Sequence, residues 1–157
     1  FSVSATSRPI RNNEVHGKDY YFLSVDEFKQ KIAHHDFVEW EEVYKNRFYG
    51  TLKSEVNRIW EKGNHVVFDV DVVGGLNIRK KYPDEALAVF IMPPSVEELE
   101  KRLRLRSTDS NEDIEVRVAK AKQELEYADK FDIIILNDEL EKAIAEAEKL
   151  VKEFILK

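Results

Sequence analysis

Two arginines and two tyrosines in the first third of the chain have the chemistry needed to bind a phosphate monoester. Arg8 and Arg11 lie on either side of Pro9, and proline favours extended or turn backbone there over helix. Both guanidinium groups can therefore converge on one target, and each planar fork can donate two hydrogen bonds to adjacent phosphate oxygens. Tyr20 and Tyr49 could add neutral hydroxyl donors.

A carboxylate at Glu39 could distinguish one purine base from another. Glu39 alternates with Val38 and Trp40 in a strand pattern, so its side chain should point opposite to theirs. A carboxylate accepts two hydrogen bonds, and guanine offers two adjacent donors, N1–H and the exocyclic amine, whereas adenine presents an acceptor at N1. Such a site would reject adenine because buried polar groups would be left unpaired.

Both patterns also have ordinary interpretations. Arg8 and Arg11 could form solvated surface pairs with the nearby Glu14 and Asp19, which contribute little to stability. Glu39 could be a charged residue on the exposed face of a half-buried strand.

Two aspartates lie at the end of an apolar run at residues 65–70, one inside it and one just after it. Asp69 and Asp71 are predicted on the same side of a strand at its carboxyl end, where open α/β sheets place their ligands. Magnesium prefers oxygen ligands and keeps several waters, so Asp69 could hold a metal-bound water while Asp71 faces a base. No direct metal ligand is predicted. Asp69 could instead be a turn or helix-capping residue.

A basic helix is predicted further along the chain. Arg102 and Arg106 are spaced i, i+4 and would share one helix face; residues 107–111 then break the helix, and a second helix carries Arg117. The alternative is a solvated basic face balanced by the glutamates at positions 97, 98 and 100.

The elements that must position these residues follow from the apolar patterning. Nearly continuous apolar runs at 65–70, 86–92 and 132–136 alternate with helical patterns, which predicts an α/β fold with a parallel sheet. Residues 4–63 indicate a small mixed lobe with strands at 20–23, 37–44 and 47–49, the last two joined by a tight hairpin turn at Lys45 and Asn46. Its helices are predicted to begin at Ser24 and near Thr51, the second ending at Gly63. Capping signatures occur at Ser24 with Glu27, Ser95 with Glu98, and Asp138 with Glu141.

Composition limits the class of protein. The 157 residues are 43% hydrophobic, enough for the core of a single domain, and contain no cysteine, which suits a cytoplasmic location. A net charge of −6 argues against broad nucleic-acid binding. No apolar run approaches the roughly 20 residues that cross a bilayer. The four histidines show no metal-ligand spacing, so no zinc site is predicted, and the oligomeric state is left open.

Residues 2–51 resemble the nucleotide-monophosphate-binding segment of guanylate kinases, and similar stretches continue to the C-terminus. The resemblance covers nearly the whole chain. It implies a P-loop kinase-like parallel sheet flanked by helices, with an inserted mixed α+β GMP-binding lobe at 4–64, core segments at 65–100 and 118–157, and a helical lid at 101–117. The implied reaction transfers the γ-phosphate of ATP, with Mg²⁺, to GMP or dGMP.

The resemblance also assigns roles to individual residues. The implied substrate-binding residues are Ser4, Arg8, Arg11, Tyr20, Glu39, Tyr49, Thr51 and Asp71. Arg102, Arg106 and Arg117 match the lid arginines that close around the transferring phosphoryl group, and Asn137 and Asp138 match positions near the adenine of ATP. Val73 stands where the family usually has glutamine, and Leu105 and Ser107 stand where it commonly has glycine.

One expected motif is absent from the printed chain, the G-x-x-x-x-G-K-[ST] phosphate loop. Because Phe1 opens directly on an apolar strand-like run, we expect a strand, phosphate loop and helix of about 30 residues to precede it. Without that loop, the fragment is expected to bind GMP better than it catalyses transfer. Two rival hypotheses remain: an inactive guanylate-kinase-like interaction module, and a kinase for a different monophosphate.

Overall fold

The computed structural model describes residues 1–105 and 111–157, which divide into two compact units, Phe1–Asp84 and Glu85–Lys157. Each unit is described by itself. The predicted Arg106 lies outside the described residues. Within them, no helix is long and apolar enough to cross a membrane.

The first unit is built on a four-stranded sheet in the order β2-β1-β4-β3. The strands are β1 (Ala5–Thr6), β2 (Tyr21–Phe22), β3 (Phe37–Tyr44) and β4 (Arg47–Leu52). β1 runs parallel to β2 and antiparallel to β4, and β3 and β4 form the predicted hairpin. Asn46 takes a φ of 58° at its turn, a conformation that asparagine tolerates better than most residues.

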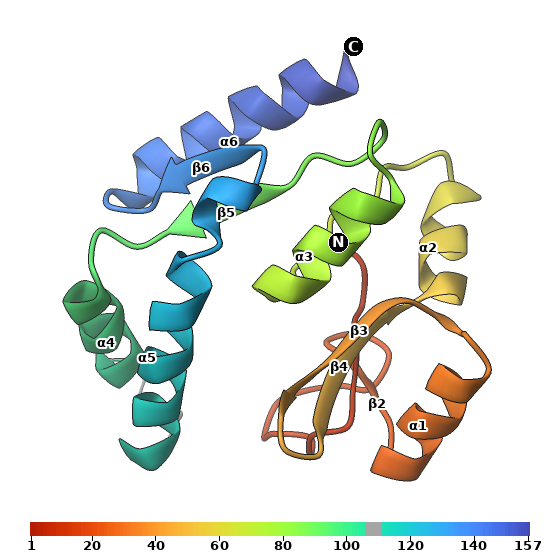
Figure 1. Ribbon diagram of the computed structural model, residues 1–157. Helices are drawn as coiled ribbons and strands as arrows, with labels where there is room; N and C mark the ends of the chain where they lie inside the picture. The colour runs from red at the N-terminus through yellow and green to blue at the C-terminus, as the bar shows by residue number, and fades with distance from the viewer. Residues whose placement is uncertain (106–110) are drawn as a thin grey trace. The chain divides into compact units, whose positions relative to one another are not determined.

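One face of this sheet is apolar and is covered by α1 (Val25–Ala33) (Figure 1). The predicted capping box is confirmed, since Ser24 accepts from the Glu27 N–H and Glu27 accepts from the Ser24 N–H. Phe28 is fully buried, and its ring stacks on Phe37 and Phe48 at centroid distances of 4.4 and 5.4 Å. This packing leaves the opposite face of the sheet for polar side chains.

A bulge in β3 decides which side chains reach that opposite face. Phe37 pairs with Leu52 and Glu39 pairs with Thr51, so the register shifts by one residue between the two pairs. Without the shift, Phe37 and Glu39 would point to the same face. The bulge therefore allows Phe37 to join the apolar core while Glu39 points to the polar side.

Two helices complete the first unit, α2 (Lys53–Trp60) and α3 (Val72–Lys81). The helix predicted from Thr51 begins two residues later, because Thr51 and Leu52 remain paired in β4. The strand predicted at 65–70 is not formed. Ser2 donates a backbone bond to Val67, but the described residues give this segment no continuous ladder of strand partners.

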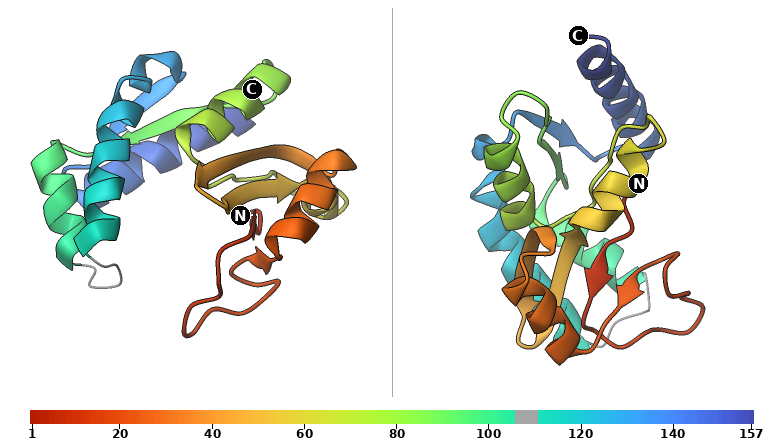
Figure 2. Two further views of the ribbon diagram at one scale, coloured as in Figure 1. Left: turned by 60° about the horizontal axis from the view of Figure 1, so that its bottom comes forward. Right: turned by 90° about the vertical axis from the view of Figure 1, so that its right-hand side faces the viewer.

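The second unit contains a parallel pair of strands, β5 (Val89–Met92) and β6 (Ile133–Leu136), which confirms the parallel pairing predicted for these two runs. Its other elements are α4 (Val96–Leu105), α5 (Asn111–Leu125), the 3₁₀ turn η1 (Ala128–Lys130) and α6 (Leu140–Ile155). α4 and α5 pack around Leu103, Ile114 and Val118, and α6 contacts β6 (Figure 2).

Two capping predictions in this unit have different outcomes. Ser95 accepts a hydrogen bond from the Glu98 N–H at the start of α4, as predicted. The prediction that Asp138 caps α6 is wrong, because the helix has Glu139 at its N-cap and no side-chain capping bond. The backbone carbonyl of Asp138 instead faces Arg102.

Candidate functional site

A row of polar residues crosses the first sheet on the face opposite α1. Glu39 on β3 lies directly opposite Thr51 on β4. On the other side of β4, Ala5 pairs with Gly50, so the antiparallel register places Ser4 next to Thr51. Three residues predicted to form the base pocket therefore stand in one row: Glu39 on β3, Thr51 on β4, and Ser4 immediately before β1.

Two buried oxygens in this row lack hydrogen-bond partners. Glu39 is 6% exposed and Thr51 is fully buried, yet neither Glu39 Oε1 nor the Thr51 hydroxyl has a partner among the described residues. Buried polar groups are nearly always paired, and leaving one unpaired costs about 1–3 kcal/mol. The pair therefore has the properties of a site that awaits polar groups from a ligand.

Burial raises the pKa of the Glu39 carboxyl to about 7. The Thr51 hydroxyl and backbone lie close enough to lower it without completing a hydrogen bond, while the charges of Asp71 and Glu41 add to the rise, and burial outweighs the rest. Glu39 is thus a carboxyl group close to its titration point near neutral pH. Donors from a ligand would favour its charged form.

The first turn of α3 closes one side of this carboxylate. A Cβ atom at Gly74 would lie 2.8 Å from Glu39 Oε2 and 3.2 Å from Asp71 Oδ1, so a larger residue would collide there. Asp71 is the N-cap of α3 and accepts from the Gly74 N–H at 2.8 Å. The structure therefore brings Asp71 close to Glu39, as the sequence predicts. Asp69 is exposed, and in the described chain no group of three or more His, Cys, Asp or Glu side chains could hold a metal ion.

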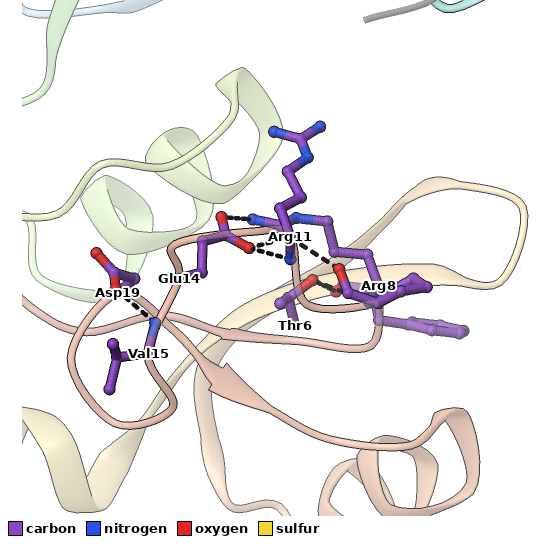
Figure 3. Close-up of polar contacts among 8 residues, drawn as sticks. Thr6, Arg8, Arg11, Glu14, Val15 and Asp19 are labelled. Carbon is purple, nitrogen blue, oxygen red and sulfur yellow. Dashed lines mark hydrogen bonds and ion pairs between the residues drawn. The ribbon is translucent and has the colours of Figure 1, made fainter. Parts of the chain in front are cut away.

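Arg8 is buried and is held in a partly buried ion pair with Glu14 at the start of the loop after β1 (Figure 3). Its Nη2 and Nη1 donate to Glu14 Oε1 and Oε2 at 2.5 and 2.7 Å, and Nη1 also donates to the Pro9 carbonyl at 2.9 Å. The alternative pairing with Glu14 is thus present, but it is partly buried rather than fully solvated, with side-chain exposures of 8% and 19%. Thr6 anchors the Arg8 backbone N–H from within β1.

Aromatic rings surround the same guanidinium group. Arg8 Cζ lies 4.9 Å from the centroid of Tyr20 and 5.5 Å from that of Phe22. Tyr49 contacts Tyr20 edge to face at 6.3 Å. Glu14, Tyr20 and Tyr49 together raise the pKa of Arg8 further above its ordinary value, so its charge is permanent.

Arg11 differs from Arg8 in exposure. Its side chain is exposed, and Figure 3 shows it extending beyond the Arg8–Glu14 pair. Its backbone N–H donates to Glu14 Oε2 at 2.8 Å. The structure therefore brings together Arg8, Tyr20 and Tyr49, and Glu14 ties the Arg11 backbone to the same cluster.

In the second unit, the side chain of one predicted functional residue binds the backbone of two others. Arg102 donates to the carbonyls of Asn137 and Asp138 at 2.8 and 3.3 Å, and its Nε donates to Glu98 at 3.0 Å. The predicted lid arginine on α4 therefore fixes the predicted adenine-side residues that follow β6. Arg117 lies on α5 and is half-buried.

Two residues of the site had no predicted role in it. From the sequence, Glu14 is predicted only as a surface partner of the arginines, although its position three residues after Arg11 places it in the same loop. Gly74 has no role predicted from the sequence, because its close approach to Glu39 depends on how α3 packs against β3.

Comparisons with known proteins agree with this geometry. A sequence model described as guanylate kinase matches residues 1–154. A guanylate kinase from Bacteroides fragilis is 58% identical over 155 residues, which is 99% of this chain and 76% of that protein. One from Porphyromonas gingivalis is 52% identical over 157 residues, covering 100% of this chain and 84% of that protein. The crystal structure of guanylate kinase from Anaplasma phagocytophilum has a TM-score of 0.83 and 28% identity, and the match covers 99% of this chain and 76% of that one.

These similarities confirm the predicted α/β P-loop kinase-like fold and the predicted nucleoside monophosphate kinase class. They also support that class over an inactive interaction module. The chain belongs to the guanylate kinase family.

Proposed function

We propose that this protein transfers the γ-phosphate of ATP to GMP or dGMP, giving ADP and the corresponding diphosphate. The observation that carries the choice of acceptor is the buried Glu39 carboxylate, which has an unpaired oxygen beside the unpaired Thr51 hydroxyl. Guanine supplies N1–H and amine donors that would pair with such a carboxylate, whereas adenine would bring an acceptor against it.

The base pocket in this proposal consists of Glu39, Thr51, Ser4 and Asp71. Glu39 would accept the two guanine donors. The Thr51 and Ser4 hydroxyls can donate or accept, which suits the remaining polar atoms of the base. Asp71 already uses Oδ1 to cap α3, so its position is fixed by the helix before any ligand binds.

The phosphate of GMP would be held by Arg8, Arg11, Tyr20 and Tyr49. Arg8 is already positioned by its buried contacts, while the exposed Arg11 would close onto the phosphate from solvent. A phosphate monoester is ionised at neutral pH, so the acceptor oxygen needs no general base.

On the donor side, Arg102, Arg106 and Arg117 would neutralise charge on the transferring group, and Asn137 and Asp138 would lie near the adenine of ATP. Phosphoryl transfer depends on alignment and charge neutralisation more than on covalent chemistry, which suits arginines. The described residues do not supply a protein cage for Mg²⁺. In this proposal the ion therefore enters with the ATP phosphates, and Asp69 would contact it at most through water.

Binding and turnover test the proposal separately. Calorimetry on this chain should show GMP binding about 100-fold more tightly than AMP. A coupled assay of ADP release by the full-length protein should show turnover with GMP and dGMP but not with AMP. Equal affinity for AMP, or no turnover with GMP, would overturn the proposal.

A further inference from the structure

We infer that Glu14 is a positioning residue. By binding one edge of the Arg8 guanidinium group, it leaves the other edge, formed by Nε and Nη2, to bind the phosphate of the acceptor nucleotide. This inference rests on the proposed function, because it concerns how that site receives a phosphate monoester. The observation behind it is that the two carboxylate oxygens of Glu14 accept from the two terminal nitrogens of Arg8, Nη1 and Nη2 (Figure 3).

A guanidinium group has five N–H donors, arranged so that two edges can each engage a bidentate anion. Glu14 takes the Nη1–Nη2 edge with both carboxylate oxygens. The second Nη1 hydrogen is directed to the Pro9 carbonyl. The donors that remain are Nε–H and the second hydrogen of Nη2, which form the other edge and have no recorded partner in the described parts of the chain.

The faces of the guanidinium plane are restricted as well. The rings of Tyr20 and Phe22 both lie within 5.5 Å of Arg8 Cζ. With an edge occupied and aromatic rings beside its plane, Arg8 has little rotational freedom. An incoming phosphate would therefore meet two parallel donors in a fixed direction and would not need to order a flexible side chain.

Glu14 could instead compete with the phosphate for Arg8. The benefit of holding Arg8 in place must therefore be weighed against this competition. Arg8 is 8% exposed and cannot lose its proton, so removing Glu14 would leave an uncompensated buried charge. That penalty is large for an ion withdrawn from water. The guanidinium would then leave its place beside Tyr20 for solvent, and the fixed edge would be lost. We therefore expect Glu14 to assist phosphate binding.

Glu14 also acts on the second arginine of the loop. Its Oε2 accepts from the Arg11 backbone N–H at 2.8 Å, so a single carboxylate fixes the Arg8 side chain and the Arg11 backbone. Beside it, Asp19 accepts from the Val15 N–H at 2.7 Å without any recorded contact to Arg8. Asp19 therefore offers a matched control for the fold of the same loop.

The test compares binding of GMP and guanosine by calorimetry, because guanosine has the base but lacks the phosphate. Glu14→Gln should weaken GMP binding about tenfold and change guanosine binding less than about twofold. Asp19→Asn, which alters only a loop contact, should leave both affinities within about twofold. In an Arg8→Ala background, Glu14→Gln should cause less than about a threefold further loss, because only its contact with the Arg11 backbone then remains to be lost.

Several outcomes would overturn the inference. Unchanged or tighter GMP binding by Glu14→Gln would show that Glu14 is neutral or a competitor. Losses that add in the Arg8→Ala background, or an equal loss in Asp19→Asn, would reduce Glu14 to a general loop contact. The proposed function fails separately, if the unmutated chain binds GMP no better than AMP.

Discussion

Glu39 and Thr51 face each other across the β3–β4 ladder, and each has a buried side-chain oxygen without a partner among the described residues. Such an arrangement opposes stability, because two polar groups have been removed from water without compensation. A site of this kind is selective, because a ligand that supplies the missing hydrogen bonds recovers that free energy and one with the wrong polarity does not.

Glu39→Gln should weaken GMP binding about 30-fold, because the amide replaces one acceptor with a donor that opposes the guanine donors. AMP binding should change little, so discrimination between the two nucleotides should fall. Calorimetry with both ligands measures the change. Glu42→Gln is the matched control, since Glu42 lies exposed on the same strand. Unchanged GMP affinity in Glu39→Gln would remove Glu39 from the pocket.

The same substitution should stabilise the free protein at high pH. The folded pKa of Glu39, about 7, lies above the ordinary 4.5. Its contribution to stability is therefore complete below pH 4.5 and is lost as pH rises through 7. The difference in free energy of unfolding between Glu39→Gln and the unmutated protein should therefore shift in favour of Glu39→Gln by about 2 kcal/mol when the pH is raised from 5 to 8. Urea denaturation at both values checks this, and an identical difference at the two pH values would contradict it.

Guanosine affinity should follow the same titration. Because the charged carboxylate accepts both base donors, binding should weaken as pH falls below about 7, approaching tenfold per pH unit. Guanosine avoids the separate titration of a phosphate. Calorimetry from pH 5 to pH 8 measures the dependence, and Glu39→Gln should abolish it. A flat profile in the unmutated protein would mean that Glu39 does not titrate in the site.

Gly74→Ala should damage the site even though alanine favours helix over glycine by about 1 kcal/mol. The added methyl group would collide with Glu39 Oε2 and crowd Asp71 Oδ1. We expect GMP affinity to fall about tenfold or more, since the collision displaces the base-reading carboxylate. Val73→Ala controls for changes in α3, because Val73 is exposed and adjacent in the helix. GMP binding that survives Gly74→Ala would show that the carboxylate has room to move.

Arg102→Ala should affect the ATP side of the reaction. It removes the bonds to the carbonyls of Asn137 and Asp138, which fix the segment after β6. In the full-length protein we expect the KM for ATP to rise about tenfold, with a smaller change in the KM for GMP. Arg104→Ala is the control, because Arg104 on the same helix pairs with Glu100 instead. Equal effects of the two substitutions would contradict a specific role for Arg102.

Part of this architecture could be predicted from local sequence. The capping box at Ser24 and Glu27, the hairpin turn at Asn46 and the parallel runs that became β5 and β6 depend on neighbouring residues or on continuous apolar patterning. The segment at 65–70 has an equally strong apolar pattern but does not form a strand. A strand requires ladder partners as well as suitable residues, and those partners are remote in sequence.

The candidate site likewise has some features that local sequence predicts and others that it does not. Arg8, Tyr20 and Glu39 could be selected by residue type and family resemblance, but the sequence offers the pairing of Arg8 with Glu14 only as an alternative, a solvated surface contact. Its burial depends on Tyr20 and Phe22, which reach Arg8 through the pairing of β1 with β2.

The sequence by itself determined the family, the fold class and the residue types that can bind a guanine nucleotide, because these are properties of composition, motif and order. The tertiary structure alone decided that a bulge turns Glu39 away from Phe37, that Gly74 approaches its carboxylate, and that Glu14 occupies one edge of Arg8. These features depend on strand register and helix packing between distant residues. Such contacts are set by the global fold, and no local pattern in the chain specifies them.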